Sequence, residues 1–308
     1  MCFLKLQKMN PKWTIKILVG TILFLHLGVN PPAVGEEIKK KKVSPGEPFG
    51  ETDHREFDNL DDLITMYQPY INNIRAYQPM YFLLGTEFEK SKFQFSFKYR
   101  FFNPEGNWAK RYPWIKGFHL AYTQTSFWDL ASESIPFQDS SYKPEIFLLT
   151  SNVFPWFQSI NRLFIQTGLQ HESNGRGETN SRSTNFLYIE PIFIYYHAST
   201  KLGIQVAPRV WTYVFNTDDT NPDLSDYRGF WRISMKLGKA DSFVFDIHFR
   251  NAKKGTSLEL DFSYPLNKYL INNIDLYLHI QYSDRLAENL LEYSERSHAL
   301  RIGFAVVR

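Results

Sequence analysis

Three residues in one stretch of the sequence are of the types that carry out acyl transfer. The stretch GLQHESNGRGETNSRSTNFLYIEP places His171 and Ser173 two positions apart, and Asn185 follows twelve positions after the serine. A serine hydroxyl becomes nucleophilic when an imidazole accepts its proton, and the imidazole needs a third group that fixes its tautomer and orientation. The residue types therefore predict Ser173 as nucleophile, His171 as base and Asn185 as the orienting group.

Strand periodicity places all three residues on apolar faces. In the strand expected over residues 162–174, the face that carries His171 and Ser173 also carries Leu163, Ile165, Thr167 and Leu169. In the strand expected over residues 184–196, Asn185 shares its face with Leu187, Ile189, Pro191 and Phe193. If residues 175–183 form the hairpin connection, Asn185 lies opposite His171 or within a residue or two of that register.

Two interpretations of this cluster stay open from the residues alone. A His-x-Ser pair arises by chance in roughly one of two or three chains of this length, so the pair itself decides little. Polar side chains at lipid-facing positions are costly and tend to be functional, which favours catalysis. The alternative is a hydrated rim, because both residues lie near the end of a strand.

The elements around this cluster predict an all-β fold. In KFQFSFKYRFF the phenylalanines and Tyr99 alternate with Gln94, Ser96 and Lys98, and this pattern of one apolar and one polar face recurs along the chain. An even number of such strands, each of about ten residues, is typical of a twelve-stranded antiparallel transmembrane β-barrel of the outer membrane. The alternative is a soluble sandwich or lipocalin-like barrel. The expected strands cover residues 79–86, 92–102, 117–130, 143–153, 162–174, 184–196, 203–214, 228–238, 242–251, 256–265, 271–284 and 296–307.

The N-terminal region predicts export. Residues 1–35 combine a lysine-bearing start, an apolar stretch and small residues, as in a secretory signal peptide; a membrane anchor is the alternative. Residues 36–78 are expected to form a periplasmic arm and residues 79–308 the barrel. The single cysteine, Cys2, lies in the signal region, so the exported chain would have no disulfide. The lysines at 39–42 are interpreted as a solvated tether, and we expect no nucleic-acid partner.

Strand order predicts the orientation of the barrel. With both termini in the periplasm of a Gram-negative bacterium, the fifth strand ends at the cell exterior. Ser173 then lies near the top of that strand, and the cluster faces the outer leaflet.

The segment HESNGRG, followed by SRSTN, resembles the active-site signature of outer-membrane phospholipase A, a calcium-dependent serine hydrolase on a twelve-stranded barrel. The similarity extends over most of residues 79–308 and includes AYTQTSFWDL, PFQDSSYKPEIFL, NTDDTNPDLSDY and LELDFSYPL. The resemblance implies phospholipase A1 and A2 activity on membrane glycerophospholipids, lysophospholipase activity, calcium as cofactor, and activation by reversible homodimerisation.

The resemblance also implies roles for individual residues. The Gly175 N–H would stabilise the oxyanion. Gln124 shares its outward face with Tyr122 and Trp128 and is interpreted either as a polar contact across the dimer seam or as a rim residue. Calcium would be held by the Arg176 carbonyl, the Ser181 hydroxyl and a carbonyl near Ser134 of the partner's loop. A second calcium site would use Glu178 and Asp219, with Glu at the position where the family usually has Asp; the alternative for NTDDT is an ordinary acidic extracellular turn.

Two other function classes compete with the hydrolase. One is a passive outer-membrane channel, and the other is a catalytically inactive structural barrel. Channel conductance would not depend on Ser173, whereas esterase activity would be lost in a Ser173→Ala variant.

Overall fold

The computed structural model describes residue 68 and residues 70–134, 136–153, 162–216, 220–239, 241–267 and 274–308. All of them belong to one compact unit, Asp58–Arg308. The predicted signal peptide and most of the predicted arm lie outside the described residues. In the described part of the chain, no helix has the length and apolar character needed to cross a membrane.

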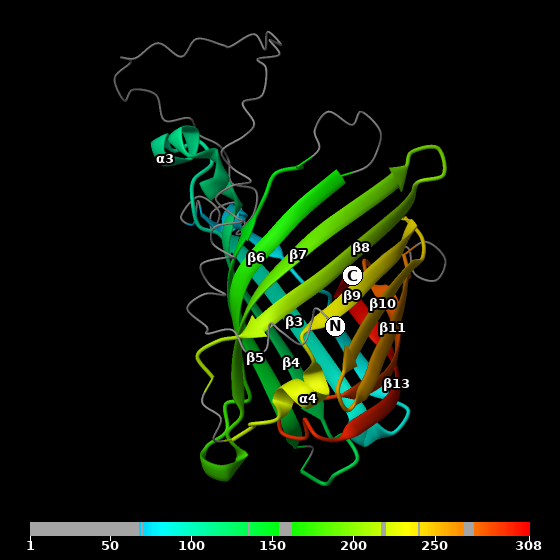
Figure 1. The fold of residues 1–308 in the computed structure, drawn as a ribbon. Helices are drawn as coiled ribbons and strands as arrows, with labels where there is room; N and C mark the ends of the chain where they lie inside the picture. Colours follow the sequence, from blue (N-terminus) through cyan, green and yellow to red (C-terminus); the bar gives the residue numbers. More distant parts are fainter. Residues whose placement is uncertain are drawn as a thin grey trace, which may run out of the picture. The chain divides into compact units, whose positions relative to one another are not determined.

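The described residues form a closed antiparallel barrel (Figure 1). Consecutive strands from β2 to β13 pair as neighbours, and β13 pairs with β2, which closes the sheet. The twelve predicted strands are confirmed as β2 Met80–Gly85, β3 Ser91–Arg100, β4 Phe118–Trp128, β5 Phe137–Leu149, β6 Arg162–Ser173, β7 Ser183–His197, β8 Leu202–Tyr213, β9 Trp231–Lys239, β10 Val244–Ala252, β11 Gly255–Pro265, β12 Tyr277–Leu286 and β13 Arg296–Val307.

The starts of β5 and β12 differ most from the sequence expectation, and one short strand is added. β12 begins at Tyr277 instead of residue 271. β5 begins at Phe137 instead of residue 143, because the polar segment QDSS continues the strand and places Asp139 and Ser141 in the barrel interior. A three-residue strand, β1 (Ile74–Ala76), follows the short 3-10 helix η2 (Ile71–Asn73) and pairs with β3 beyond the end of β2. The last residues of the predicted arm therefore form part of the barrel.

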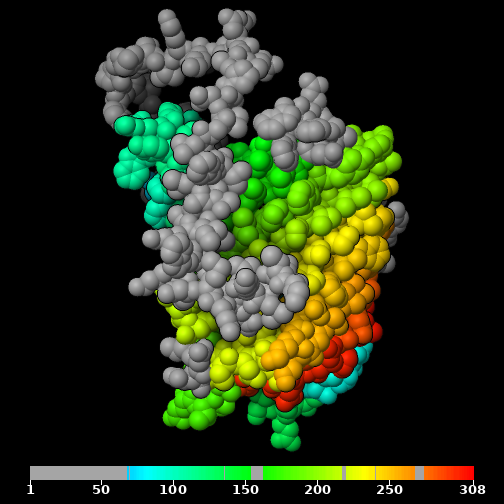
Figure 2. Space-filling view, in the orientation of Figure 1, coloured from blue at the N-terminus to red at the C-terminus, as the bar shows by residue number. Residues whose placement is uncertain are grey.

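The barrel has a polar interior and an apolar outer wall. Ser96 is fully buried, whereas its neighbours Phe95 and Phe97 are 39% and 38% exposed. The same alternation recurs around the barrel, and the strands from β7 (green) to β11 (orange) form one continuous wall in Figure 2. A soluble barrel would bury its large apolar side chains, so this arrangement supports the membrane barrel over the soluble alternative.

Ion pairs fill much of the interior. Glu259 accepts hydrogen bonds from Lys92 and Arg285, at 3.4 and 2.7 Å, and Glu288 pairs with Arg301 at 2.9 Å. Further pairs join Arg209 to Glu190 and Arg228 to Glu172. These charges are compensated in pairs, as buried charges must be. Most of these side chains line a cavity of about 520 Å³, including Glu172, Glu190, Arg209, Arg228, Glu259, Arg285 and Glu288.

An apolar plug lies at the end of the barrel where β6 ends. Leu224 of helix α4 (Leu224–Arg228) packs with Ala287 and Leu290 of the β12–β13 connection, and all three side chains are at most 3% exposed. A hydrogen bond attaches this connection to β5, because the Leu290 N–H donates to the Asp139 carboxylate at 3.2 Å. In Figure 1, α4 lies across this end of the barrel. A blocked interior argues against a wide passive channel.

Candidate active site

The outward faces of β6 and β7 bring His171 and Asn185 together. The two residues are direct partners in the antiparallel register, as the sequence predicted. Asn185 Oδ1 lies 2.8 Å from His171 Nδ1. Between His171 and Ser173, Glu172 points the other way and is 4% exposed. The buried position of Glu172 therefore places His171 and Ser173 on the outward side of β6, as the period of two predicted.

The surroundings of Asn185 determine which of its atoms faces the histidine. Asn185 Nδ2 donates to the Phe215 carbonyl at 3.3 Å and to Asn216 Oδ1 at 3.4 Å. Its amide oxygen is thus directed to His171, whose Nδ1 must carry the proton to donate to it. This tautomer leaves His171 Nε2 as an unprotonated base.

Asn216 is a supporting residue that the sequence analysis did not identify. Its Oδ1 also accepts the backbone N–H of Asn185 at 2.6 Å, and its Nδ2 donates to Thr184 Oγ1 at 3.3 Å. The preceding residue, Phe215, has a φ of +53°, which is unusual for a side chain of this size. The chain leaving β8 thus bends so that two consecutive residues bind the Asn185 amide. The only sequence signal was a single asparagine at the start of the polar segment NTDDTN.

Ser173 is the last residue of β6 and lies on the same outward face as His171. Its register partners are Ser183 on β7 and Tyr142 on β5. Among the described residues, no hydrogen bond joins Ser173 to His171. Catalytic hydrogen bonds are often long without substrate and shorten in the Michaelis complex. The strand therefore places Ser173 and His171 on the same face, and a hydrogen bond between them would form when substrate binds.

Gly175 occupies a position that requires glycine. Its φ is +66°, and an added Cβ would lie 2.8 Å from Cε2 of the Tyr142 ring. A side chain would be strained by the backbone and would collide with the tyrosine. The Tyr142 ring therefore packs directly against the backbone of the residue whose N–H is predicted to bind the oxyanion.

Buried Asn174 organises the connection between β6 and β7. Its Oδ1 accepts the N–H groups of Arg176 and Arg182, at 3.3 and 3.0 Å, and its Nδ2 donates to the Asn180 carbonyl at 2.9 Å. The Asn174 side chain is buried within the connection that it closes. One asparagine therefore fixes both ends of the loop that follows Ser173.

Comparison with known proteins identifies the family. The phospholipase A1 family matches residues 84–306, about three quarters of the chain. This chain belongs to the phospholipase A1 family. Phospholipase A1 of Escherichia coli is 30% identical over 186 residues, and that of Klebsiella pneumoniae is 30% identical over 187 residues. Each alignment covers 59% of this chain, and the chain spans 60% of the length of these relatives.

Solved structures of this family share the barrel. The outer membrane phospholipase A of Escherichia coli is 23% identical with a TM-score of 0.61, covering 76% of this chain and 98% of that one. The Salmonella typhi outer membrane phospholipase, solved as a dimer with bound calcium, is 21% identical with a TM-score of 0.61, covering 76% and 92%. The predicted twelve-stranded barrel is confirmed. Both solved structures are outer membrane proteins by name, which agrees with the predicted location.

The residues of this protein that are predicted to bind calcium lie in or near the β6–β7 connection. The Arg176 guanidinium donates to the carbonyls of Phe137 and Gln138 and lies 3.5 Å from Asp139, which ties the connection to β5. Ser181 begins the return toward β7, and its hydroxyl makes no hydrogen bond among the described residues. A backbone carbonyl and a hydroxyl are oxygen ligands of the kind that calcium prefers, so this donor set fits the ion.

The remaining calcium candidates are less closely grouped. Ser134 is exposed in the connection between β4 and β5, at the same end of the barrel. Glu178 is exposed with a φ of +54°. Its predicted partner, Asp219, lies outside the described residues. The two-residue calcium site therefore stays a prediction.

Gln124 lies on the outer wall, as predicted, but its amide is already bonded. Its Oε1 accepts from the Tyr122 hydroxyl and its Nε2 donates to Ser126 Oγ, both at 3.1 Å. Ser126 Oγ in turn lies 2.8 Å from Ser140 Oγ on β5. A contact of Gln124 across a dimer seam would have to replace or extend this chain of hydrogen bonds.

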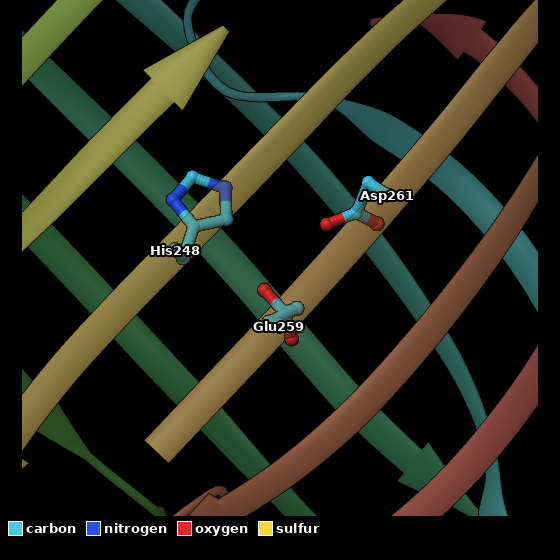
Figure 3. A group of neighbouring side chains, drawn as sticks. All are labelled: His248, Glu259 and Asp261. Atoms are coloured by element: carbon cyan, nitrogen blue, oxygen red, sulfur yellow. The ribbon is translucent and has the colours of Figure 1, made fainter. Parts of the chain in front are cut away.

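A second group of metal-ligand types lies inside the barrel. Figure 3 shows His248, Glu259 and Asp261 directed toward one another, with one ligand atom of each within 4.8 Å of the others. Their partners are already present: Lys92 and Arg285 bind Glu259, and Asp261 accepts from His279 and Gln281 at 2.7 and 2.8 Å. A divalent cation would add positive charge beside two cations, so this group fits a structural ion-pair network better.

Proposed function

We propose that this protein is a calcium-dependent serine hydrolase that cleaves acyl esters of glycerophospholipids and lysophospholipids at the first or second position. The observation that carries the proposal is the outward His171–Asn185 pair beside Ser173. A hydrolase acting on soluble esters would need a cleft for its substrate. Here the polar group stands on a wall that contacts lipid, where a phospholipid is already the neighbouring molecule.

The proposed chemistry uses the tautomer that Asn185 imposes. Ser173 Oγ attacks the ester carbonyl while His171 Nε2 takes its proton, and His171 Nδ1–H keeps its bond to Asn185. The imidazolium then gives the proton to the leaving lysophospholipid oxygen as the ester bond breaks. Water attacks the acyl-enzyme with His171 again as base, which releases the fatty acid and restores Ser173. The Gly175 N–H would stabilise the negatively charged oxygen in both tetrahedral intermediates.

Calcium would be held by the Arg176 carbonyl, the Ser181 hydroxyl and a carbonyl near Ser134 of a second copy. When bound, it would supply positive charge that stabilises the developing oxyanion. Asn174 supports this assignment, because it closes the loop that carries both ligands from the same chain. Activity would then depend on reversible homodimerisation, with Gln124 in the seam and Glu178 with Asp219 as a second calcium site. The Ser173 end would face the outer leaflet.

The deciding experiment measures fatty-acid release from phosphatidylcholine micelles by the refolded protein, with calcium or with chelator. Ser173→Ala should abolish release, by at least about 1,000-fold, because Ser173 is the nucleophile of the proposed mechanism. Ser183→Ala is the matched control, since Ser183 faces Ser173 across the register on the same wall. Equal losses in the two variants, or release by Ser173→Ala, would refute the assignment. Product analysis would show which ester position is cleaved.

A further inference from the structure

The long connection between β3 and β4 has a composition unlike a simple turn. It lies at the end of the barrel opposite Ser173 and contains helix α3 (Asn107–Arg111) and the 3-10 helix η4 (Pro113–Gly117). The turn of residues 198–201 between β7 and β8, at the same end, is much shorter. In Figure 1, α3 lies beyond the end of the strands.

Large aromatic side chains of this connection are exposed although its backbone is well organised. Trp108, Tyr112 and Trp114 are 70%, 48% and 51% exposed. The buried positions are instead Ala109 and Ile115, at 1% and 6%. The segment therefore folds onto the protein through its small and aliphatic residues and presents its aromatic rings outward. Several large exposed aromatic side chains in one short connection indicate an interaction surface.

This aromatic surface is continuous with the lipid-facing wall. Phe101 and Phe118 are the last outward residues of the β3–β4 pair, and their rings are 5.9 Å apart. Phe102 contacts Phe118 at 5.6 Å and Trp108 at 6.4 Å, which links the wall to α3. A tilted strand rises roughly 2.5 Å per residue along the barrel axis. Phe101 is therefore about 20 Å from Phe93 along that axis, toward the α3 end. That distance approaches the height of the apolar band of such barrels, so α3 begins near its edge.

The charges of the connection are mostly positive. Lys110, Arg111 and Lys116 are exposed, against the single acidic residue Glu105. Among the described residues, none of these three cations takes part in an ion pair. Tryptophan and tyrosine favour the membrane–water boundary, where the ring meets lipid and the polar atom meets water, and cations favour anionic headgroups. The aromatic and cationic residues together fit one kind of partner.

We propose that residues 101–117 dock onto anionic phospholipid headgroups of the leaflet at this end of the barrel. In the orientation expected from the strand order, this is the periplasmic leaflet of the outer membrane. Trp108, Tyr112 and Trp114 enter the boundary region, and the three cations bind phosphate groups. The connection thus anchors the β3–β4 edge to its membrane. The inference does not depend on hydrolase activity.

A site-specific accessibility measurement tests the proposal. The chain has one cysteine, Cys2, so a Cys2→Ser background allows a unique thiol at Asn107→Cys on α3. The full chain is placed in nanodiscs of phosphatidylcholine alone or with one third phosphatidylglycerol, and the reaction rate with a water-soluble maleimide is measured. Ser199→Cys is the matched control, because it lies in an exposed turn at the same end.

Docking should slow the reaction at position 107 about fivefold or more in the phosphatidylglycerol discs. Position 199 should react equally in both lipids. Each basic residue near an anionic surface favours binding by about fivefold, so Lys110→Glu, Arg111→Glu and Lys116→Glu together should remove the lipid dependence. Equal rates at position 107 in both lipids would overturn the proposal. So would protection that follows protein concentration instead of phosphatidylglycerol, because a second copy would then cover the surface.

Discussion

The clearest test of the proposed active-site geometry is the removal of Asn216, whose side chain binds Asn185 and Thr184 and not Ser173. Asn216→Ala deletes the acceptor for the Asn185 backbone N–H at 2.6 Å and for Asn185 Nδ2 at 3.4 Å. The Phe215 carbonyl, 3.3 Å from Asn185 Nδ2, is then the remaining acceptor for the amide. Asn185 can rotate, and the tautomer of His171 is no longer enforced.

The size of the effect follows from the bonds that are lost. A neutral hydrogen bond contributes about 0.5–1.5 kcal/mol, and the 3.4 Å contact belongs at the low end. A total of about 1–2 kcal/mol, if it appears in the transition state, lowers kcat by roughly 5- to 30-fold. Because the change misorients the base and leaves lipid contacts intact, KM should change by less than about twofold. Asn216→Asp keeps the Oδ1 acceptor and should recover most of the rate.

A matched control separates positioning from stability. Asn221 belongs to the same β8–β9 connection, and its Nδ2 donates to the Ser183 carbonyl of β7 at 3.0 Å. Asn221→Ala should therefore destabilise the connection by a similar amount without affecting kcat. The assay is fatty-acid release with calcium at saturating substrate, together with urea unfolding of each variant. Equal losses of kcat in the two alanine variants, or no rescue by Asn216→Asp, would refute the positioning role.

Three further predictions concern the surroundings of the site. Gly175→Ala should lower kcat/KM about tenfold or more, because a positive φ costs an alanine roughly 1–2 kcal/mol and its Cβ collides with the Tyr142 ring. The same fatty-acid release assay measures this, and normal activity of the variant would contradict the prediction. Glu172→Gln should lower the free energy of unfolding by about 3–5 kcal/mol, because it leaves Arg228 buried without its carboxylate partner. Adding Arg228→Met to the same chain should recover much of this loss. Urea unfolding measures both variants. Burial alone would raise the pKa of Glu288, but Lys92 and Arg301 lower it to about 2. The stability from this depressed pKa, on the order of 3 kcal/mol, is present above pH 4.5 and is lost as the pH falls toward 2, so the unfolding midpoint of Glu288→Gln should be less sensitive over that window.

The strands and their faces were predictable because each depends only on local alternation. The period of two assigned His171 and Ser173 to the outward face, and the hairpin length limited Asn185 to positions near His171. Burial confirms the assignment, since Glu172 between them is nearly inaccessible. The predicted start of β5 at residue 143 was wrong, because the pattern considered only apolar alternation. The polar residues of β5 resemble a turn when burial in a polar interior is not considered.

The supporting residues of the site were not predictable from local patterns. Asn216 follows Asn185 by 31 positions, and Asp139 accepts the N–H of Leu290 across 151 positions. No periodicity links residues at such separations. Asn216 is one polar residue in a polar connection, and Asp139 is one of several polar residues at the start of β5. The apolar plug could not be predicted for the same reason. Its residues Leu224, Ala287 and Leu290 come from two connections that meet only when the barrel closes.

The position of the site also gives a physical reason for a neutral third residue. A carboxylate at the place of Asn185 would stand on a lipid-facing wall, where an exposed charge is far more costly than an amide. The amide of Asn185 has its donors bound to the Phe215 carbonyl and Asn216, and its oxygen bound to His171. Every polar atom of that side chain is thus satisfied by the protein before any lipid arrives. An asparagine stabilises the imidazolium less than an aspartate would, but it keeps the histidine oriented without placing an ionised group against hydrocarbon.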